Sequence, residues 1–430
     1  MASGQKMRMK LNKSSQLLLV STLGLAAAGF LSACATLTTD FVFVSSAKAA
    51  GTNNYGQVDV FEINSESGQM RQIPTSPFPS GGRNPVAEAI SSDDTNLYVV
   101  NRDDNTIVQF IIGNDGKVYP QNTYNTPGIF PLATTVAGSN LFVANTYQPL
   151  AICSPASPCS GSFAVFPVLP ASGSTPAGSL QRTTPLNTCN GLQYQPLSLS
   201  GAAAGNIILP TAITANASSA TSGSATVFIS AYDTTANTGY VFGFSVSTAQ
   251  QTCNGATTTV PTVTALTGSP WKAGTYPSNI ALDPTGSYAY VTDSTNGNVL
   301  GFSIGSGGLT ALAGSPYPAG NGPSAVVVDA KAQYAFVANG QDSNVTAYSI
   351  SSGALTSIGN FTTGTQPVAM GIDPSLNQFL FTANFLGDTV SGFQIQASDG
   401  TLINSKGSSF AASPNPTAIV AIPHGAVSKQ

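Results

Sequence analysis

The chain has 430 residues, of which 7% are charged, and its 14 Lys+Arg and 18 Asp+Glu give a net charge of −4. This balance, without a basic patch or stripe, argues against nucleic-acid binding. A hydrophobic content of 42%, in segments where apolar residues alternate with polar ones, argues against a disordered low-complexity chain.

The N-terminus predicts a bacterial lipoprotein signal. Four basic residues precede the apolar run 17–30, which is followed by the tetrapeptide Leu-Ser-Ala-Cys at 31–34. This order is typical of a secretory signal rather than a spanning helix. The tetrapeptide resembles a lipobox, which predicts a lipid on Cys34. The alternative is an ordinary signal cut near Ala49. The lipobox is favoured because that cut would remove the strand segment Phe43-Val44.

Residues 1–33 are therefore expected to be the signal peptide and residues 34–39 a lipid-anchored tether. Removing 1–33 takes four basic and no acidic residues, so the mature chain carries a net charge of −8. The tether spans at most ~20 Å, since an extended residue covers about 3.4 Å. Ala35 rather than an aspartate follows the cysteine, so we expect the outer membrane or cell surface, with the periplasmic side also open.

Residues 40–430 are expected to form one domain built from a repeat. Residues 277–320 predict four short strands, at 278–282, 288–292, 299–304 and 309–312, with alternating apolar residues and Gly, Pro, Asn or Asp at their ends. Similar stretches begin at Pro323 and Pro367. Four strands in a unit of about 45 residues are typical of a propeller blade.

The number of blades follows from a marker in the second strand of each unit. The marker is an aromatic residue followed by a β-branched one. It occurs seven times, at Phe43, Tyr98, Phe142, Phe228, Tyr290, Phe336 and Phe381. The chain begins with a second strand and ends with a first strand, 416–422, which together complete one blade. The sequence therefore predicts an all-β, seven-bladed β-propeller of four-stranded antiparallel blades, closed by its C-terminal strand, with an insertion at 146–205 in blade three.

Four further cysteines predict two disulfides in an exported chain, with three possible pairings. The preferred interpretation pairs Cys153 with Cys159 and Cys189 with Cys253. Metal binding is the rival, and it lacks a Cys-x-x-Cys pair and a nearby histidine, since His424 is the only one. We expect no metal and no cofactor.

The steps Tyr-Val-Thr-Asp (290–293), Tyr-Val-Val-Asn (98–101) and Phe-Val-Ala-Asn (142–145 and 336–339) resemble YVTN-type propeller repeats. With the passage from Gly308 to Pro323, they resemble the seven-bladed lactonase family, whose namesake is 6-phosphogluconolactonase. The resemblance covers nearly all of the mature chain and implies the fold. The related muconate-lactonising propellers use a histidine and arginines in a central site, whereas this sequence has no histidine inside a blade.

The resemblance implies a functional face formed by the loops between strands two and three and between blades. On this face we expect ten ligand-binding residues: Asn101, Asp103, Asn145, Tyr147, Asp233, Trp271, Tyr276, Asp293, Asn339 and Asn384. The alternative interpretation is that the Asn and Asp residues only shape turns, where they bond to their own backbone.

Glu88 departs from the repeat pattern. The third residue after the proline that opens each first strand is apolar or nearly so in six blades, and in blade two it is Glu88. A buried carboxylate must be paired or neutralised. It is either one half of a structural pair with Arg83 or Arg102, or a general base whose developing oxyanion one of these arginines would stabilise.

Two functions follow. The first is a lipid-anchored, monomeric module at the cell envelope that binds a glycan, lactone or envelope protein and touches the membrane only through its lipid. The second is a hydrolase that opens an extracytoplasmic sugar lactone with Glu88, Arg83 and Arg102. A serine triad and a phosphate loop are both missing from the sequence, so the residues leave open whether the protein is an enzyme.

Overall fold

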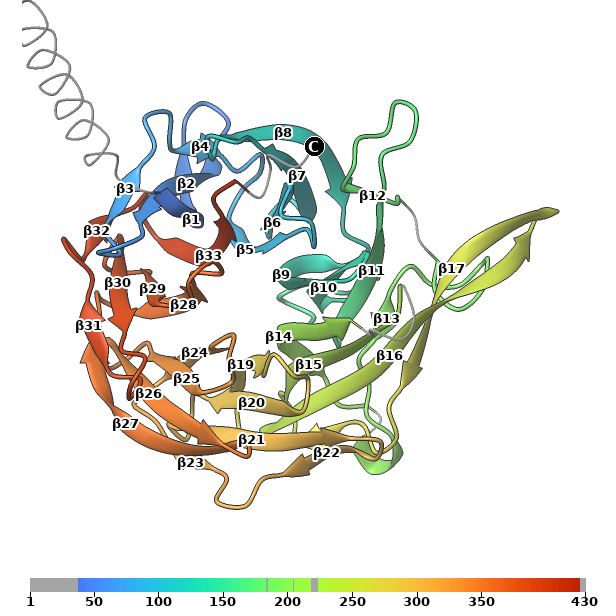
Figure 1. Ribbon diagram of the computed structural model, residues 1–430. Helices are drawn as coiled ribbons and strands as arrows, with labels where there is room; N and C mark the ends of the chain where they lie inside the picture. The colour runs from blue at the N-terminus through green and yellow to red at the C-terminus, as the bar shows by residue number, and fades with distance from the viewer. Residues whose placement is uncertain (1–37, 183–184, 204, 218–222, 426–430) are drawn as a thin grey trace, which may run out of the picture. The chain divides into compact units, whose positions relative to one another are not determined.

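The computed structural model describes residues 38–182, 185–203, 205–217 and 223–425 as seven antiparallel sheets around a central opening (Figure 1). Each sheet contains a path of four strands, which confirms the predicted all-β, seven-bladed propeller. The predicted signal peptide and Cys34 lie outside the described residues. Within the described ranges, no helix has the length and apolar character needed to cross a membrane.

The strands of each blade follow one another from the channel outward. Blade one consists of β33 (Pro416–Pro423), β1 (Thr38–Ala50), β2 (Tyr55–Asn64) and β3 (Met70–Gln72), with β4 (Phe78–Pro79) also on β2. Blade two consists of β5 (Pro85–Ile90), β6 (Asn96–Asn101), β7 (Thr106–Ile112) and β8 (Val118–Asn125). Blade three consists of β9 (Ile129–Ala137), β10 (Asn140–Tyr147), β11 (Ser162–Leu169) and β12 (Ser179–Leu180), with β13 (Gln195–Pro196) also on β11.

The remaining blades have the same order. Blade four consists of β14 (Ile208–Ala217), β15 (Ala225–Asp233), β16 (Thr238–Cys253) and β17 (Ala256–Ala265), with β18 (Trp271–Lys272). Blade five consists of β19 (Pro277–Leu282), β20 (Tyr288–Asp293), β21 (Asn298–Gly305) and β22 (Gly308–Ala311), with β23 (Tyr317–Pro318). Blade six consists of β24 (Pro323–Val328), β25 (Tyr334–Asn339), β26 (Asn344–Ser351) and β27 (Ala354–Thr362). Blade seven consists of β28 (Pro367–Ile372), β29 (Phe379–Asn384), β30 (Thr389–Ile395) and β31 (Leu402–Asn404), with β32 (Phe410–Ala411).

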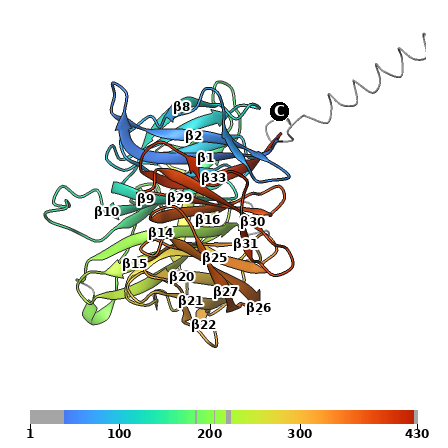
Figure 2. The ribbon, with the colours of Figure 1, turned by 90° about the vertical axis from the view of Figure 1, so that its left-hand side faces the viewer.

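The two ends of the described chain close the ring. β33 pairs antiparallel with β1, from Asp40 opposite Pro423 to Ser46 opposite Pro416, and Figures 1 and 2 show the two strands side by side. The predicted closure, in which the C-terminal strand completes the first blade, is therefore confirmed. Pairing the ends leaves no open edge around the channel.

The core lies between neighbouring blades. The seven marker residues of the second strands are at most 1% exposed. One cluster joins Phe43 of blade one to Val99 of blade two, and another joins Phe228 of blade four to Val291 of blade five. Because the two faces of a strand alternate, each second strand packs one set of side chains against the preceding blade and the other against the next.

Every innermost strand has a β-bulge directly after a proline at or near its start, which is called here the opening proline. In blade two, Pro85 pairs with Asn101 and Ala87 with Val100, so Val86 has no partner. The same shift occurs in the other six first strands. A bulge turns the extra residue out of the ladder and often lies beside a functional site. In this ring it places one residue from each blade at the channel.

Both preferred disulfides are confirmed, since Cys153 is bonded to Cys159 and Cys189 to Cys253. Cys189 lies in the segment after β12, and Cys253 ends the long strand β16, which projects from the ring with β17 (Figure 1). Disulfides persist in oxidising compartments, so they indicate an exported protein.

Candidate functional site

The first strands enclose a cavity of about 350 Å³ at the centre of the ring. All seven bulge residues line it: Val86, Leu132, Thr211, Ser278, Ser324, Val368 and Thr417. A second cavity, of about 480 Å³, shares five of these residues and adds Tyr276, Gln341 and Gln366 from the loops. The first cavity is called the central cavity, and the second is the mouth of the channel. Both volumes are in the range of small-molecule pockets.

Hydroxyl groups at the bulges connect neighbouring blades. Ser278 Oγ donates to the carbonyl of Pro323 at 2.5 Å, Ser324 Oγ to that of Pro367 at 2.7 Å, and Thr417 Oγ1 to that of Pro85 at 2.8 Å. In each case the acceptor is the opening proline of the next blade. These residues were not among the predicted site residues, although their position directly after each opening proline could have identified them.

Glu88 is 6% exposed and lines the central cavity. Its Oε2 accepts a hydrogen bond of 2.7 Å from Ser45 Oγ of blade one, whereas its buried Oε1 has no hydrogen-bond partner among the described residues. Burial raises the pKa of Glu88 to about 8, against the opposing effect of the hydrogen bond from Ser45. The carboxyl group is therefore held at the edge of the channel, between blades one and two.

Asp59 is a buried carboxyl group close enough to Glu88 to affect its charge, and the sequence prediction did not include it. It is on β2, where it accepts hydrogen bonds from Gln72 Nε2 at 2.7 Å and from the Ser413 amide at 2.8 Å. Burial raises its pKa, and its charge contributes to the raised pKa of Glu88. Among the described residues, no group of three or more His, Cys, Asp or Glu is placed to hold a metal ion.

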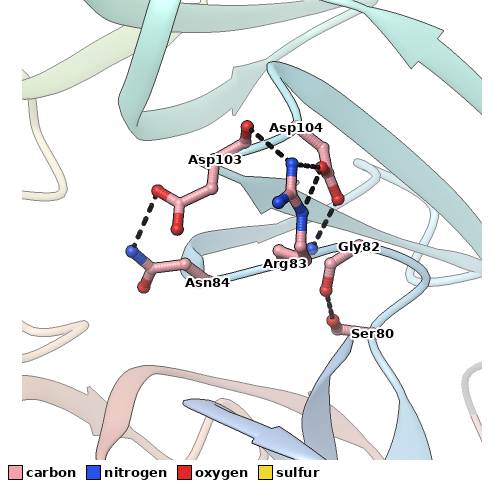
Figure 3. Close-up of polar contacts among 6 residues, drawn as sticks. All are labelled: Ser80, Gly82, Arg83, Asn84, Asp103 and Asp104. Carbon is pink, nitrogen blue, oxygen red and sulfur yellow. Dashed lines mark hydrogen bonds and ion pairs between the residues drawn. The ribbon is translucent and has the colours of Figure 1, made fainter. Parts of the chain in front are cut away.

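Arg83 and Arg102 do not meet Glu88 as the sequence hypothesis required. Arg83, with its side chain 55% exposed, forms an ion pair with Asp104 and donates its Nε to Asp104 Oδ1 at 2.7 Å (Figure 3). The Arg102 guanidinium lies 5.2 Å from the ring centre of Phe130. No hydrogen bond or ion pair joins either arginine to Glu88 in the described part of the chain.

Most residues of the predicted ligand-binding face are buried. Six of its residues are fully buried: Asn101, Asn145, Asp233, Asp293, Asn339 and Asn384. Asp293, for example, accepts from the amides of Thr275 and Tyr276, and Asn339 Oδ1 accepts from that of Gly320. The contacts of Asp293 and Asn339 are of the turn-shaping kind. Asn145 differs, because neither of its side-chain amide atoms has a hydrogen-bond partner among the described residues.

The other four residues are in different surroundings. Trp271 packs against Phe228, with ring centres 6.5 Å apart, and Tyr147 is buried against Phe130. Asp103 accepts a hydrogen bond of 3.3 Å from Asn84 on the exposed loop of Figure 3. Tyr276, which is 40% exposed, lines the mouth of the channel. Of the ten predicted residues, it alone is among those lining the mouth or the central cavity.

The chain folds as a ring-closed, seven-bladed β-propeller with a cavity at its axis. The chain belongs to the family described as "Lactonase, 7-bladed beta-propeller", whose model matches residues 54–149, 241–371 and 318–419, more than half of the chain. Comparison with curated proteins gives no match.

Two solved structures have the same fold. One is a Bacteroides fragilis protein described as a "putative 6-phosphogluconolactonase", with 17% identity and a TM-score of 0.65 over 90% of this chain and 99% of that one. The other is the periplasmic gluconolactonase of Pseudomonas aeruginosa, with 18% identity and a TM-score of 0.61 over 90% and 99%. At these identities the similarity establishes the fold alone.

Proposed function

We propose that the protein hydrolyses a lactone in its central cavity, with Glu88 as the general base. The observation that carries this proposal is Glu88 itself, the one carboxylate among the described residues lining that cavity, with a pKa near 8. Catalytic bases work best when their pKa is near the working pH, and a buried carboxyl in a cleft is a candidate for this role. Family membership supports the same reaction class.

The reaction needs one proton transfer to Glu88 and one from it. Ionised Glu88 takes a proton from a water molecule as the water oxygen bonds to the lactone carbonyl carbon, which leaves a negative charge on the carbonyl oxygen. The ring C–O bond then breaks, the carbonyl re-forms, and the leaving ring oxygen takes the proton from Glu88. The product is an open-chain hydroxy acid.

The developing negative charge requires a hydrogen-bond donor in the cavity. Asn279 lines the cavity, and its Oδ1 accepts from the Val326 amide at 3.4 Å. Its Nδ2 has no protein partner among the described residues, which makes this amide the preferred donor to the oxyanion. Asn279 thus replaces Arg83 and Arg102 in the mechanism suggested by the sequence.

The proposal is tested by assaying the purified protein against sugar and aliphatic lactones, beside Glu88→Gln and Asn279→Ala. We expect turnover by the wild type, loss in Glu88→Gln, and a decrease of about 10²-fold in kcat for Asn279→Ala, typical of a lost oxyanion donor. Circular dichroism checks that both variants are folded. Full activity in folded Glu88→Gln contradicts the proposal.

Binding without turnover is the second candidate. It is favoured by one observation: no Lys, Arg or His is among the described residues that line the central cavity, so a cation for the oxyanion is missing. The same assay separates the two functions. A lactone that binds the cavity and remains closed supports a binding module at the cell envelope.

We further propose that the exported protein is anchored by a lipid on Cys34. The lipobox at 31–34 supports this, as do the two disulfides. The first described strand, β1, begins at Thr38, close in sequence to Cys34. Palmitate labelling tests the anchor: the wild type is expected to incorporate label and Cys34→Ser to lack it, whereas equal labelling overturns the proposal.

A further inference from the structure

A groove on the outer side of blades two and three lies away from the central channel. It consists of two cavities, of about 280 and 380 Å³, which share Tyr124 and Arg182. Tyr124 is on β8 of blade two, and Arg182 is in the insertion of blade three directly after β12. The insertion, which the channel site does not use, therefore forms one wall of a separate site.

The arginine is fixed on an aromatic platform. The Arg182 guanidinium lies 4.8 Å from the centre of the Tyr124 ring, and its Nη1 donates to the Thr123 carbonyl at 3.2 Å. A cation above an aromatic face is attracted by the ring electrons. The two contacts hold an exposed side chain in one orientation, with further guanidinium N–H groups available to a ligand.

The Tyr124 ring is also held in place by hydrogen bonds to its hydroxyl group. The Tyr124 hydroxyl donates to Gln109 Oε1 at 3.1 Å and accepts from the Leu180 amide at 3.0 Å. Gln109 is fully buried and donates its Nε2 to Asn96 Oδ1 at 2.8 Å. This network joins blade two to the insertion, so the groove is a built feature rather than a chance gap between loops.

The lining determines which ligand fits. Among the described residues of both cavities there is no Asp or Glu, and the ion pairs of the described chain do not include Arg182. Asn125 and Gln193 add exposed amides, which suit hydroxyl groups, while Pro127 and Phe166 add apolar surface. A planar guanidinium matches carboxylate and phosphate groups through paired hydrogen bonds.

We infer that this groove binds an anionic saccharide, whose carboxylate or phosphate is held by Arg182 and whose hydroxyl groups meet the neighbouring amides. The inference is independent of lactone hydrolysis, because none of its residues lines the central cavity.

The test titrates the full protein with galacturonate, glucose 6-phosphate and neutral galactose by calorimetry. At least one of the two anionic sugars is expected to bind more tightly than galactose, and which of them binds identifies the acidic group. Arg182→Gln is expected to weaken that binding about tenfold or more, as for a lost charged hydrogen bond. Arg182→Lys is expected to recover part of it, since it keeps the charge without the planar fork.

Two controls locate the binding. Arg71→Gln removes another exposed arginine, on blade one, and is expected to change nothing. Glu88→Gln changes the channel and should leave the affinity unaltered, so this site and lactone hydrolysis can fail separately. Equal affinity for galactose, no binding of either anionic sugar, or wild-type affinity in folded Arg182→Gln overturns the inference.

Discussion

Burial of Glu88 in the folded protein disfavours the ionised form of its carboxyl group. One carboxylate oxygen has a hydroxyl partner and the other has none among the described residues, so the protonated form is favoured in the folded state. Glutamine at this position has nearly the same shape as glutamate and does not ionise. The cost of ionising Glu88 is therefore a property of the native fold, and it can be measured through stability.

This cost predicts a pH dependence of stability. The pKa of Glu88 is about 8 in the folded protein and 4.5 when unperturbed. The folded state therefore binds the proton more tightly, and the resulting stability is present at low pH and is lost as pH rises through 8. Between pH 5 and 9 the free energy of unfolding of the wild type should fall relative to Glu88→Gln, with an upper bound of about 5 kcal/mol.

Urea unfolding at several pH values measures this difference. Glu66→Gln, at an exposed position on blade one, serves as the matched control and should follow the wild type. A constant difference between wild type and Glu88→Gln across the pH range contradicts the raised pKa.

At the scale of single residues, the sequence could identify Glu88 but not its surroundings. Glu88 was visible because six equivalent positions carry other residue types. Its partner Ser45 belongs to a different blade and had no signal. Asp59 is the one charged residue at a third-strand position that carries uncharged residues in the other six blades, so comparing that position between blades could have identified it. Arg83 was near Glu88 in the sequence, yet Asp104 on the adjacent loop is its partner.

At the scale of elements, the bulges connect local sequence to assembly of the ring. Thr417 Oγ1 donates to the carbonyls of both Ser45 and Pro85, and so joins the closing strand β33 to blades one and two. Thr417→Val should destabilise the protein by about 1 kcal/mol, the net value of a hydrogen bond. Thermal unfolding compares it with Thr356→Val at an exposed position of β27, where little change is expected. Equal effects of the two substitutions would remove the proposed role of Thr417.

Strand positions followed from the sequence because alternating apolar residues report which face is buried. The segments predicted at 288–292 and 299–304 lie within β20 and β21. The bulges could not be predicted in this way, since they depend on the hydrogen-bond register between strands. The Asn and Asp residues that end the second strands are typical of turns. Polar binding loops contain the same residue types, so the sequence could not distinguish the two.

At the scale of the whole molecule, the disulfide that encloses the longer stretch of chain should stabilise the fold more. Cys189 and Cys253 are 64 residues apart, and Cys153 and Cys159 only 6. The loop-entropy relation gives roughly 4 kcal/mol for the first and roughly 2 kcal/mol for the second. Denaturant unfolding of the two double Cys→Ser variants should show the larger loss for the 189–253 pair. The reverse order would contradict this entropic account.

The ring itself was predictable because strand segments near the two ends of the chain complete one blade together. The outer groove was not, since it requires the insertion of blade three to fold back against β8 through Tyr124 and Leu180. A contact between two blades through a single hydroxyl group occurs once, so the periodic sequence pattern does not reveal it. The global topology therefore follows from repeated local signals, whereas the sites depend on contacts that occur once.

The most direct test of the central claim is the pH profile of lactone hydrolysis by the wild type and Glu88→Gln. If Glu88 is the general base, kcat/KM of the wild type should rise with pH and level off near its pKa of about 8. Glu88→Gln should lack that rise and retain only background turnover. A wild-type profile that is flat between pH 6 and 9, or a variant with the same profile as the wild type, would contradict the assignment of Glu88.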